Sequence, residues 1–418
     1  MKVSIGFLVS CSLVIYFFAA LQGGLYFMKN RFQEVGIAIV LALYIYTTLY
    51  TAFLPKKFNW TFWAFATPLF CLYAMVFYAF IFSMNAETKM FPSIMASRAF
   101  LVTMICPVVY FLYQAGYEIK HIERVFFISL VVLLFNYLFH YYRIDMRAAY
   151  FSSDHTVSAL ITFDEWRGFR LKAPTYVIMI LLLFSGMRLS QKGNVLVKGG
   201  CIIIMATSAY VLSIVMSRAA MATVILSVFI YPFFFQKPNR INILLLGIPG
   251  GLLVFFFLIS ILLGAIINHF ANDWSFQVRM ESWKIAWDSF TQNLIFGFGQ
   301  HSYYSKSYQQ IFGPKFFPSD LGIVGVAFKY GLIGVFLYIF FNLFVMYRLL
   351  LANWIYQKYY QKHNPLIWAL FIMVTSLLIN IILQPGFVFA PGLTLASFSI
   401  ALTSCYLEEI KHGQRPVF

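Results

Sequence analysis

Long apolar runs separated by short polar connections dominate the sequence from end to end. Many runs approach 20 residues, enough for a helix to cross a hydrocarbon core of about 30 Å. They are too long and too continuous for a membrane barrel, whose strands need alternating segments of about 10 residues. Lipid offers the backbone no hydrogen-bond partners, so the runs are predicted to be helices. The predicted spans are 3–27, 35–54, 61–84, 99–117, 125–142, 173–187, 195–216, 219–235, 241–267, 319–347, 366–383 and 392–406.

This pattern predicts an all-α polytopic integral membrane protein, with residues 1–418 forming a single transmembrane domain of about twelve spans. Composition agrees, because only 11% of residues are charged, whereas a soluble domain carries about 25%. All five cysteines fall inside apolar runs and form no C-x-x-C pair, so neither a disulfide framework nor a zinc site is predicted. The first run is interpreted as an uncleaved span rather than a signal peptide.

The chain has a net charge of +16, and the distribution of its Lys and Arg residues among the short loops predicts an orientation, because cytoplasmic loops of membrane proteins are enriched in these residues. Placing both termini in the cytoplasm gives a threefold excess of basic residues in cytoplasmic segments over short outer connections. The expected partners of these charges are membrane lipid phosphates or an anionic substrate, not nucleic acid. The predicted cytoplasmic residues are Lys2, Lys56, Lys57, Lys120, Arg124, Arg188, Lys192, Lys198, Lys237, Arg240, Arg348, Lys358, Lys362, Lys411 and Arg415; the outer ones are Lys29, Arg31, Lys89, Arg98 and Arg218.

Two long loops, 143–172 and 268–318, are both predicted to be external. External loops are usually poor in basic residues, and the guanidinium group matches phosphate oxygens with a planar pair of donors. Arginines in these loops therefore indicate a bound anion. Within the second loop, 273–291 is predicted to be an amphipathic helix at the membrane surface. The loop arginines are Arg143, Arg147, Arg167, Arg170 and Arg279, and the apolar stripe of the helix is Phe276, Met280, Trp283, Trp287 and Phe290.

Ser217-Arg218 lies between two apolar runs. It is interpreted either as a fixed cation for a substrate phosphate or as an external turn whose arginine reaches lipid phosphate. Arg279, four residues before Trp283, is followed by Gly297-Phe298-Gly299, where glycines permit a tight turn. Taken alone, this second pattern is more typical of an interfacial helix.

Asp320 is the only acid between Asp288 and Glu408 and stands at the outer mouth of the tenth predicted span. It suits either a helix cap or a base that accepts a proton, and one residue could do both. Lys329 lies nine residues further along, where a buried ammonium needs a partner or a water-filled cavity. His301 is an alternative proton acceptor.

The sequence contains no G-x-x-x-x-G-K-[ST] phosphate loop, no G-x-S-x-G elbow and no His/Asp/Glu cluster with metal-ligand spacing. We therefore expect no cofactor: no ATP, no nicotinamide and no metal. One hypothesis for the function is a transporter or flippase that moves an anionic substrate across the membrane. Such a protein would place charges at mid-membrane and often repeats its halves, but no repeat is evident and the charges gather at one face.

Four segments resemble the superfamily of Wzy-type O-antigen polymerases and O-antigen ligases, in both order and spacing. Arg167 to Arg170, read as Arg-Gly-Phe-Arg, is similar to the arginine- and glycine-bearing outer loop of that family, and the resemblance covers about residues 160–345. The four segments are Ser217-Arg218-Ala219, Arg279…Trp283…Ala286, Gly297-x-Gly299 and Asp320…Gly331-Leu332-Ile333-Gly334.

The resemblance implies a metal-independent inverting glycosyltransferase of the GT-C type, acting at the periplasmic face of a bacterial inner membrane. Its substrates would be oligosaccharides on undecaprenyl pyrophosphate, and its partners a chain-length regulator and a flippase. Arg218 and Arg279 would bind the pyrophosphate with help from Arg170. Arg167, Arg147, Lys329 and Ser217 are further candidate contacts. Ligases of the superfamily carry a His where this sequence has Asp320, which favours a polymerase, with ligase and flippase as alternatives.

Overall fold

The computed structural model describes residues 5–21, 32–52, 69–79, 81, 98–153, 155–158, 160–164, 168–191, 194–215, 274–299, 310–313, 316, 318, 321–379 and 390–411. The elements are α1 (Ile5–Ala20), α2 (Phe32–Ala52), a helix over Leu69–Ala79, η3 (Arg98–Met104), α5 (Ile105–Gln114), α6 (Ile119–Arg143), α7 (Met146–Tyr150), α8 (His155–Ser158), β1 (Ile161–Asp164), β2 (Gly168–Leu171), α9 (Thr175–Ser190), α10 (Val195–Val215), α14 (Trp274–Gln292), α16 (Gly322–Tyr360), α17 (Pro365–Ile379) and α18 (Ala390–Lys411).

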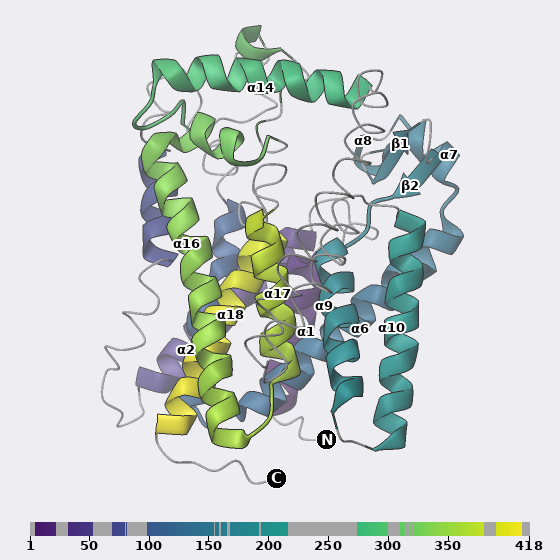
Figure 1. Ribbon diagram of the computed structural model, residues 1–418, viewed down its shortest axis with the longest axis vertical. Helices are drawn as coiled ribbons and strands as arrows, with labels where there is room; N and C mark the ends of the chain where they lie inside the picture. Colours follow the sequence, from purple (N-terminus) through teal and green to yellow (C-terminus); the bar gives the residue numbers. More distant parts are fainter. Residues whose placement is uncertain are drawn as a thin grey trace, which may run out of the picture.

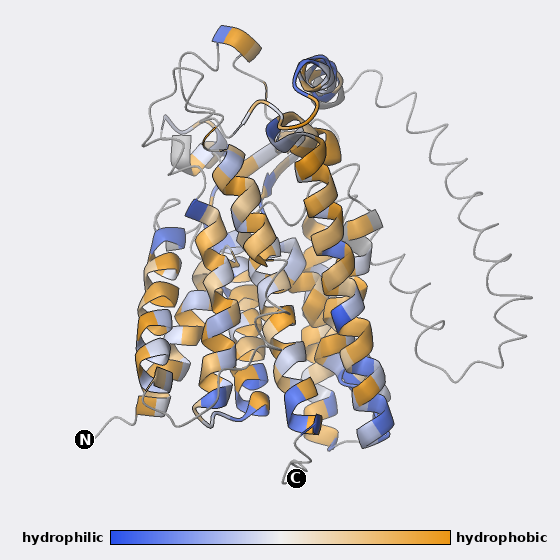
Figure 2. Cartoon of the chain, turned by 90° about the vertical axis from the view of Figure 1, so that its left-hand side faces the viewer, coloured by the Kyte–Doolittle hydropathy of each residue, from blue (hydrophilic) through white to orange (hydrophobic). Residues whose placement is uncertain are grey.

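The described chain is mostly helical and forms a bundle of apolar helices (Figure 1). Five of them, α2, α6, α10, α16 and α18, are long and apolar enough to cross a membrane. Hydrophobic residues run along most of the bundle and hydrophilic ones gather towards its ends (Figure 2). The predicted helical membrane protein is thus confirmed. The count of twelve spans stays a prediction, because 219–235 and 241–267 lie outside the described residues.

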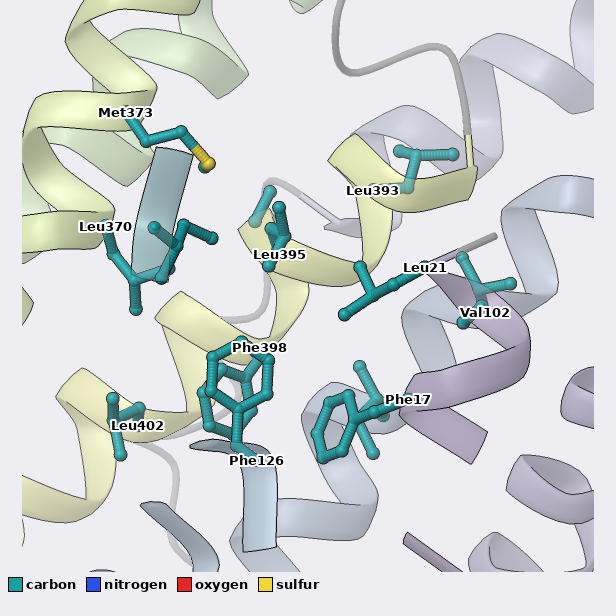
Figure 3. Packing of buried hydrophobic residues seen from close by; sticks show 14 of the residues in the cluster. Phe17, Leu21, Val102, Phe126, Leu370, Met373, Leu393, Leu395, Phe398 and Leu402 are labelled. Carbon is teal, nitrogen blue, oxygen red and sulfur yellow. The ribbon is translucent and has the colours of Figure 1, made fainter. Parts of the chain in front are cut away.

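Helix α18 forms the centre of the bundle, and every residue from Ala390 to Tyr406 is buried. It packs against α5, α16 and η3. Around its middle, the Phe398 ring stacks on Phe126 with centroids 4.3 Å apart and meets Phe17 edge-on at 5.2 Å (Figure 3). Three helices remote in sequence therefore share one aromatic core.

Helix α16 corrects the prediction for 319–347, because it continues to Tyr360. Arg348, predicted to lie in a cytoplasmic loop, is only 1% exposed, and its Nη2 donates a hydrogen bond to Ser404 Oγ at 3.0 Å. The charge lowers local hydropathy without ending the helix, because the packing face continues through Val345, Leu349 and Ala352, all buried at helical spacing. Hydropathy alone therefore does not locate the end of the helix, and the bounds of the span stay a prediction.

A two-stranded antiparallel hairpin lies inside the first long loop and makes the fold mostly helical rather than all-α. Strand β1 pairs with β2 in the register Ile161↔Leu171, Thr162↔Arg170 and Phe163↔Phe169. Apolar residues alternate with polar ones along each strand, which is typical of a half-buried hairpin. This period-two signal is short, and the sequence analysis missed it.

The described elements of both long loops lie at the same end of the bundle (Figure 1). Helix α14 crosses this end, and the hairpin lies there beside α7 and α8, whereas α1 begins and α18 ends at the opposite end. The described parts of the two loops thus share one end of the bundle, which agrees with their placement on one side of a membrane. That this side is periplasmic stays a prediction.

Candidate functional site

Helix α16 is interrupted at Gly331, whose backbone angles are φ 63° and ψ −165°. Only glycine adopts this region without considerable strain. An interruption takes carbonyl groups before it and N–H groups after it out of the helical ladder. Since Gly331 and its neighbours Lys329 and Tyr330 are buried, these backbone groups need partners from elsewhere in the protein.

The segment 294–299, which follows α14 and which we name the clamp, supplies these partners. Phe298 N–H donates to Phe328 C=O at 2.7 Å and Gly299 N–H donates to Lys329 C=O at 2.9 Å. In the opposite sense, Leu332 N–H donates to Leu294 C=O at 2.8 Å. Four hydrogen bonds in all join the clamp to both sides of the interruption, the fourth running from Ile333 N–H to Ile295 C=O at 3.3 Å.

Glycine permits the clamp and α16 to approach this closely. A Cβ on Gly297 would lie 2.5 Å from the Gly331 nitrogen, and one on Gly331 would lie 2.2 Å from the Ile295 oxygen. Gly297 and Gly299 both have positive φ, 69° and 86°, so the tight turn predicted from this glycine pair is confirmed. Two of the four family-like segments therefore meet backbone to backbone.

Tyr78 adds a third element to this junction. Its hydroxyl donates to the Tyr330 carbonyl, inside the interruption, and its ring packs edge-on against Phe296 of the clamp with centroids 5.9 Å apart. One side chain from the helix Leu69–Ala79 thus contacts both partners. The sequence does not mark Tyr78 as a contact residue, because it is one of 27 tyrosines and belongs to no local motif.

The predicted helix over 273–291 is confirmed as α14, whereas the predicted stripe is partly buried and partly exposed. The position of α14 at the membrane surface stays a prediction. Its buried side is made of Ser282, Ala286, Ser289 and Phe290, whereas Met280, Trp283 and Trp287 are exposed. Small side chains allow α14 to pack closely on α16, and this leaves the larger indoles outside, stacked on each other with centroids 6.3 Å apart. The side chain of Phe276 lies outside the described residues.

Ala286 belongs to a compact apolar cluster beneath α14. The Phe298 and Phe328 rings stack in parallel within it, at 5.6 Å between centroids, so the cluster links the clamp to the first turns of α16. Its buried members are Ala286, Phe312, Phe316, Leu321, Val324 and Phe328.

Two candidate cations lie on α16 and on α14, the helix that packs against it. Lys329, only 6% exposed, lies two residues before the interruption. A lysine this deeply buried next to irregular backbone is typical of a functional position in a membrane protein. Arg279 is exposed on α14.

Two further candidates belong to the hairpin region. The register places Arg170 on the hairpin face opposite Phe163 and Phe169, and its Nη1 donates to the Val215 carbonyl at 3.0 Å. Val215 ends α10 two residues before Ser217-Arg218, so Arg170 contacts the chain just ahead of that segment. Arg147 is exposed on α7, whose first turn is capped by Asp145 Oδ1, which accepts from Arg147 N–H and Ala148 N–H.

The remaining sequence-predicted site residues lie outside the described residues: Arg167, Ser217, Arg218, His301 and Asp320. Their roles stay predictions. Leu321 occupies the N-cap position of α16 without a side-chain cap bond, so the cap position lies one residue after Asp320. Among the described residues, no group of three or more His, Cys, Asp or Glu side chains is placed to hold a metal ion.

A polar network at the opposite end of the bundle also escaped the sequence analysis. Asn364 Nδ2 donates to Glu123 Oε1 and to the Tyr406 hydroxyl, both at 3.0 Å, while Asn364 Oδ1 accepts from Leu366 N–H at 2.9 Å. The amide thus caps α17 and ties it to α6 and α18. An Asn-Pro pair before an apolar run is the signal that predicts this cap.

The fold and this junction define a polytopic helical membrane protein with an interrupted helix and a buried lysine beside the interruption. Residues 203–339 match the sequence model of a family described as O-antigen ligase. This stretch includes α14, the clamp and the interruption of α16. The match supports the O-antigen polymerase/ligase superfamily and a role in the biosynthesis of O antigen or a related surface polysaccharide, and it does not separate a polymerase from a ligase. No curated protein matches the chain.

Proposed function

We propose that the chain polymerises oligosaccharide repeat units carried on undecaprenyl pyrophosphate, at the periplasmic face of a bacterial inner membrane. It would act as a metal-independent inverting glycosyltransferase of the GT-C type and build O antigen or a related polysaccharide. One lipid-linked chain donates its glycan, and the next lipid-linked unit accepts it. A flippase that delivers units and a chain-length regulator are the partners that such a reaction calls for.

In the proposed reaction, a hydroxyl of the acceptor sugar attacks the anomeric carbon of the donor. A new glycosidic bond forms as the bond between that carbon and the pyrophosphate oxygen breaks, which inverts the anomeric configuration. Asp320 takes the hydroxyl proton, with His301 as the alternative acceptor. The lipid pyrophosphate leaves with the bonding electrons, so the sugar–pyrophosphate bond supplies the driving force.

The cations stabilise the charge that develops on the leaving pyrophosphate. Arg218, Arg279 and Arg170 would bind its oxygens, since guanidinium offers paired donors to phosphate. Lys329 would face the same substrate from the interruption of α16. Arg167, Arg147 and Ser217 are further candidate contacts.

The observation that carries this proposal is the junction itself. Two segments that resemble the superfamily, Gly297-x-Gly299 and Gly331 to Gly334, are joined by four backbone hydrogen bonds inside the stretch that matches the family model. Irregular backbone at membrane depth occurs where it is enclosed by protein or lines a cavity, and transporters and channels place binding sites there. The contact of Arg170 with Val215 supports a shared site with Arg218.

The test is a reconstitution of the purified protein in liposomes with a lipid-linked repeat unit, a metal chelator and no nucleotide. The expected product is a ladder of lengthening glycans together with released undecaprenyl pyrophosphate. Arg218→Ala, Arg279→Ala and Asp320→Ala should each abolish the ladder, while Arg143→Ala, which replaces an exposed arginine at the end of α6 outside the proposed set, should keep it. Normal ladders from all three site variants would refute the proposal.

Ligation is the second candidate function, favoured by the description of the matching family as O-antigen ligase. A ligase would transfer a finished glycan to lipid A core. In cells, loss of a polymerase leaves lipopolysaccharide bearing a single repeat unit, whereas loss of a ligase leaves lipopolysaccharide without any repeat unit. Translocation of the lipid-linked sugar without bond formation would instead indicate a flippase.

A further inference from the structure

Helix α6 carries a continuous apolar stripe on its exposed side. The members recur at steps of four and three residues, so they form one face of the helix. Since α6 is long and apolar enough to span a membrane, this face meets lipid. The stripe consists of Ile128, Val132, Phe135, Phe139 and Tyr142.

The stripe ends in residues typical of the lipid headgroup layer. The hydroxyl of Tyr142 is hydrogen-bonded to that of Tyr210 on α10, and both side chains are exposed. The guanidinium carbon of Arg143 lies 4.8 Å from the centroid of the Phe139 ring. Tyrosines with a polar tip, and arginines that lie along an aromatic ring, mark the membrane interface.

A cluster of four aromatic rings, which we name the hairpin cluster, follows directly after this point. It comprises Tyr150 of α7, Phe151, and the cross-strand pair Phe163 and Phe169, whose centroids are 4.6 Å apart. Tyr150 contacts the other three rings at 5.1 to 5.8 Å. Nevertheless, Phe151 is 71% exposed and Phe163 45% exposed.

We propose that the hairpin cluster inserts into the headgroup layer of the lipid leaflet at this end of the bundle, as a membrane anchor separate from the spanning helices. The chain passes from the lipid-facing stripe of α6 to the cluster within a few residues, and Figure 1 places the hairpin and α7 at the edge of the bundle next to α10. The apolar surface is therefore continuous with a surface that already meets lipid. Arg147, exposed on the same short helix, would meet lipid phosphates.

The chemistry of the rings favours lipid over a sugar as the occupant. Three of the four rings are phenylalanines, which have no hydrogen-bonding group with which to orient a sugar. Large exposed apolar patches mark interaction sites, and aromatic rings with basic neighbours on a surface element are typical of interfacial anchors.

The anchor also has a consequence that rests on the proposed function. Arg170 lies on the opposite face of the same hairpin and bonds to Val215 at the end of α10. Rings embedded in the headgroup layer would hold this guanidinium close to the depth of lipid phosphates, where the pyrophosphate of a lipid-linked substrate must lie. The anchor itself would exist whichever reaction the protein catalyses.

The test measures the depth of nitroxide spin labels in proteoliposomes, from the ratio of their accessibility to oxygen and to a water-soluble nickel complex. Labels replace Phe151 and Phe163 by Phe151→Cys and Phe163→Cys, with Phe135→Cys as the lipid reference. Gln361→Cys, in the exposed turn after α16, is the aqueous reference, with the nickel complex present on both sides of the membrane. Cys11 and Cys71, the two native cysteines that are not buried, are replaced by alanine throughout. Thermal unfolding of each labelled protein confirms that it is folded.

We expect the oxygen-to-nickel ratio at both cluster positions to lie nearer the value at Phe135 than the value at Gln361. Ratios equal to that at Gln361 would overturn the anchor. A nickel accessibility that falls when lipid-free oligosaccharide is added would assign the rings to sugar, and would equally overturn it. Because neither readout depends on turnover, failure of the anchor and failure of the proposed transferase are distinguishable.

Discussion

Helices α18 and α16 differ in how their buried polar groups obtain hydrogen-bond partners. In α18 several buried hydroxyls donate to carbonyls of their own helix, as Ser399 does to Leu395 at 2.7 Å and Thr403 to Ser399 at 2.8 Å. In α16 the backbone is interrupted at Gly331, and a segment more than 30 residues away in sequence must complete it.

This contrast indicates that functional residues lie near the interruption of α16 rather than along α18. A regular helix has a complete backbone hydrogen-bond ladder and needs no second segment to supply one, so the backbone of α18 is explained by its own geometry and by packing. An interruption that demands glycine and a partner segment costs stability, and such costs concentrate at functional sites. The variants below test this contrast.

Gly331→Ala should have the largest effect. The added Cβ would lie 2.2 Å from the Ile295 oxygen, on backbone that only glycine adopts readily, for a cost of about 2–5 kcal/mol. We expect a clearly lower unfolding temperature in detergent, followed by tryptophan fluorescence, and loss of glycan polymerisation.

Gly200→Ala is the matched control, because a Cβ there meets nothing within 4 Å and Gly200 lies within regular α10. It should leave the unfolding temperature unchanged or slightly raised. Equal behaviour of the two variants would show that the interruption imposes no constraint.

Lys329→Met should remove activity while leaving the fold. Methionine has a similar length and suits the buried environment of a residue that is 6% exposed. We expect an unfolding temperature close to that of the wild type and a large fall in polymerisation in the reconstituted assay. Unchanged turnover would show that the ammonium group does not contact the substrate.

Tyr78→Phe should have a smaller effect, chiefly on stability. The variant keeps the ring against Phe296 but leaves the Tyr330 carbonyl without its hydroxyl donor, at a cost of about 1–2 kcal/mol. Thermal unfolding should show this as a modest decrease. A decrease as large as that of Gly331→Ala would mean that the hydroxyl, and not the clamp, holds the interruption.

Ser399→Ala should have the smallest effect. The hydroxyl is fully buried but bonds only to its own helix, so its removal should change the free energy of unfolding by no more than about 0.5 kcal/mol. Chemical denaturation in detergent measures this change. A loss exceeding that of Tyr78→Phe would abolish the contrast between the two helices.

The sequence predicted the helical membrane fold because lipid allows few alternatives, and the positions of most described helices followed from hydropathy. It could not predict that α16 continues past Arg348, since hydropathy records the charge and not Ser404, 56 residues away, which receives its hydrogen bond. The hairpin was missed because four-residue strands give too short a pattern among long apolar runs.

The candidate site was predicted in its parts but not in its assembly. Gly297 and Gly299 were recognisable as a tight turn and Gly331 only as part of a family-like segment, and nothing local shows that they contact one another. Likewise, the role of Arg170 beside Val215 depends on the register of the hairpin. Contacts between segments far apart in sequence are set by packing, which one sequence without its structure does not reveal.

The most direct test of the proposed site asks which side of the membrane its cations face. Arg147→Cys and Arg279→Cys mark the end with the hairpin and α14, and Gln361→Cys marks the exposed turn after α16 at the other end. A membrane-impermeant thiol reagent should label the first two in intact cells and Gln361→Cys only after the inner membrane is permeabilised. The reverse pattern would place the guanidinium groups in the cytosol and contradict a periplasmic transfer from lipid pyrophosphate.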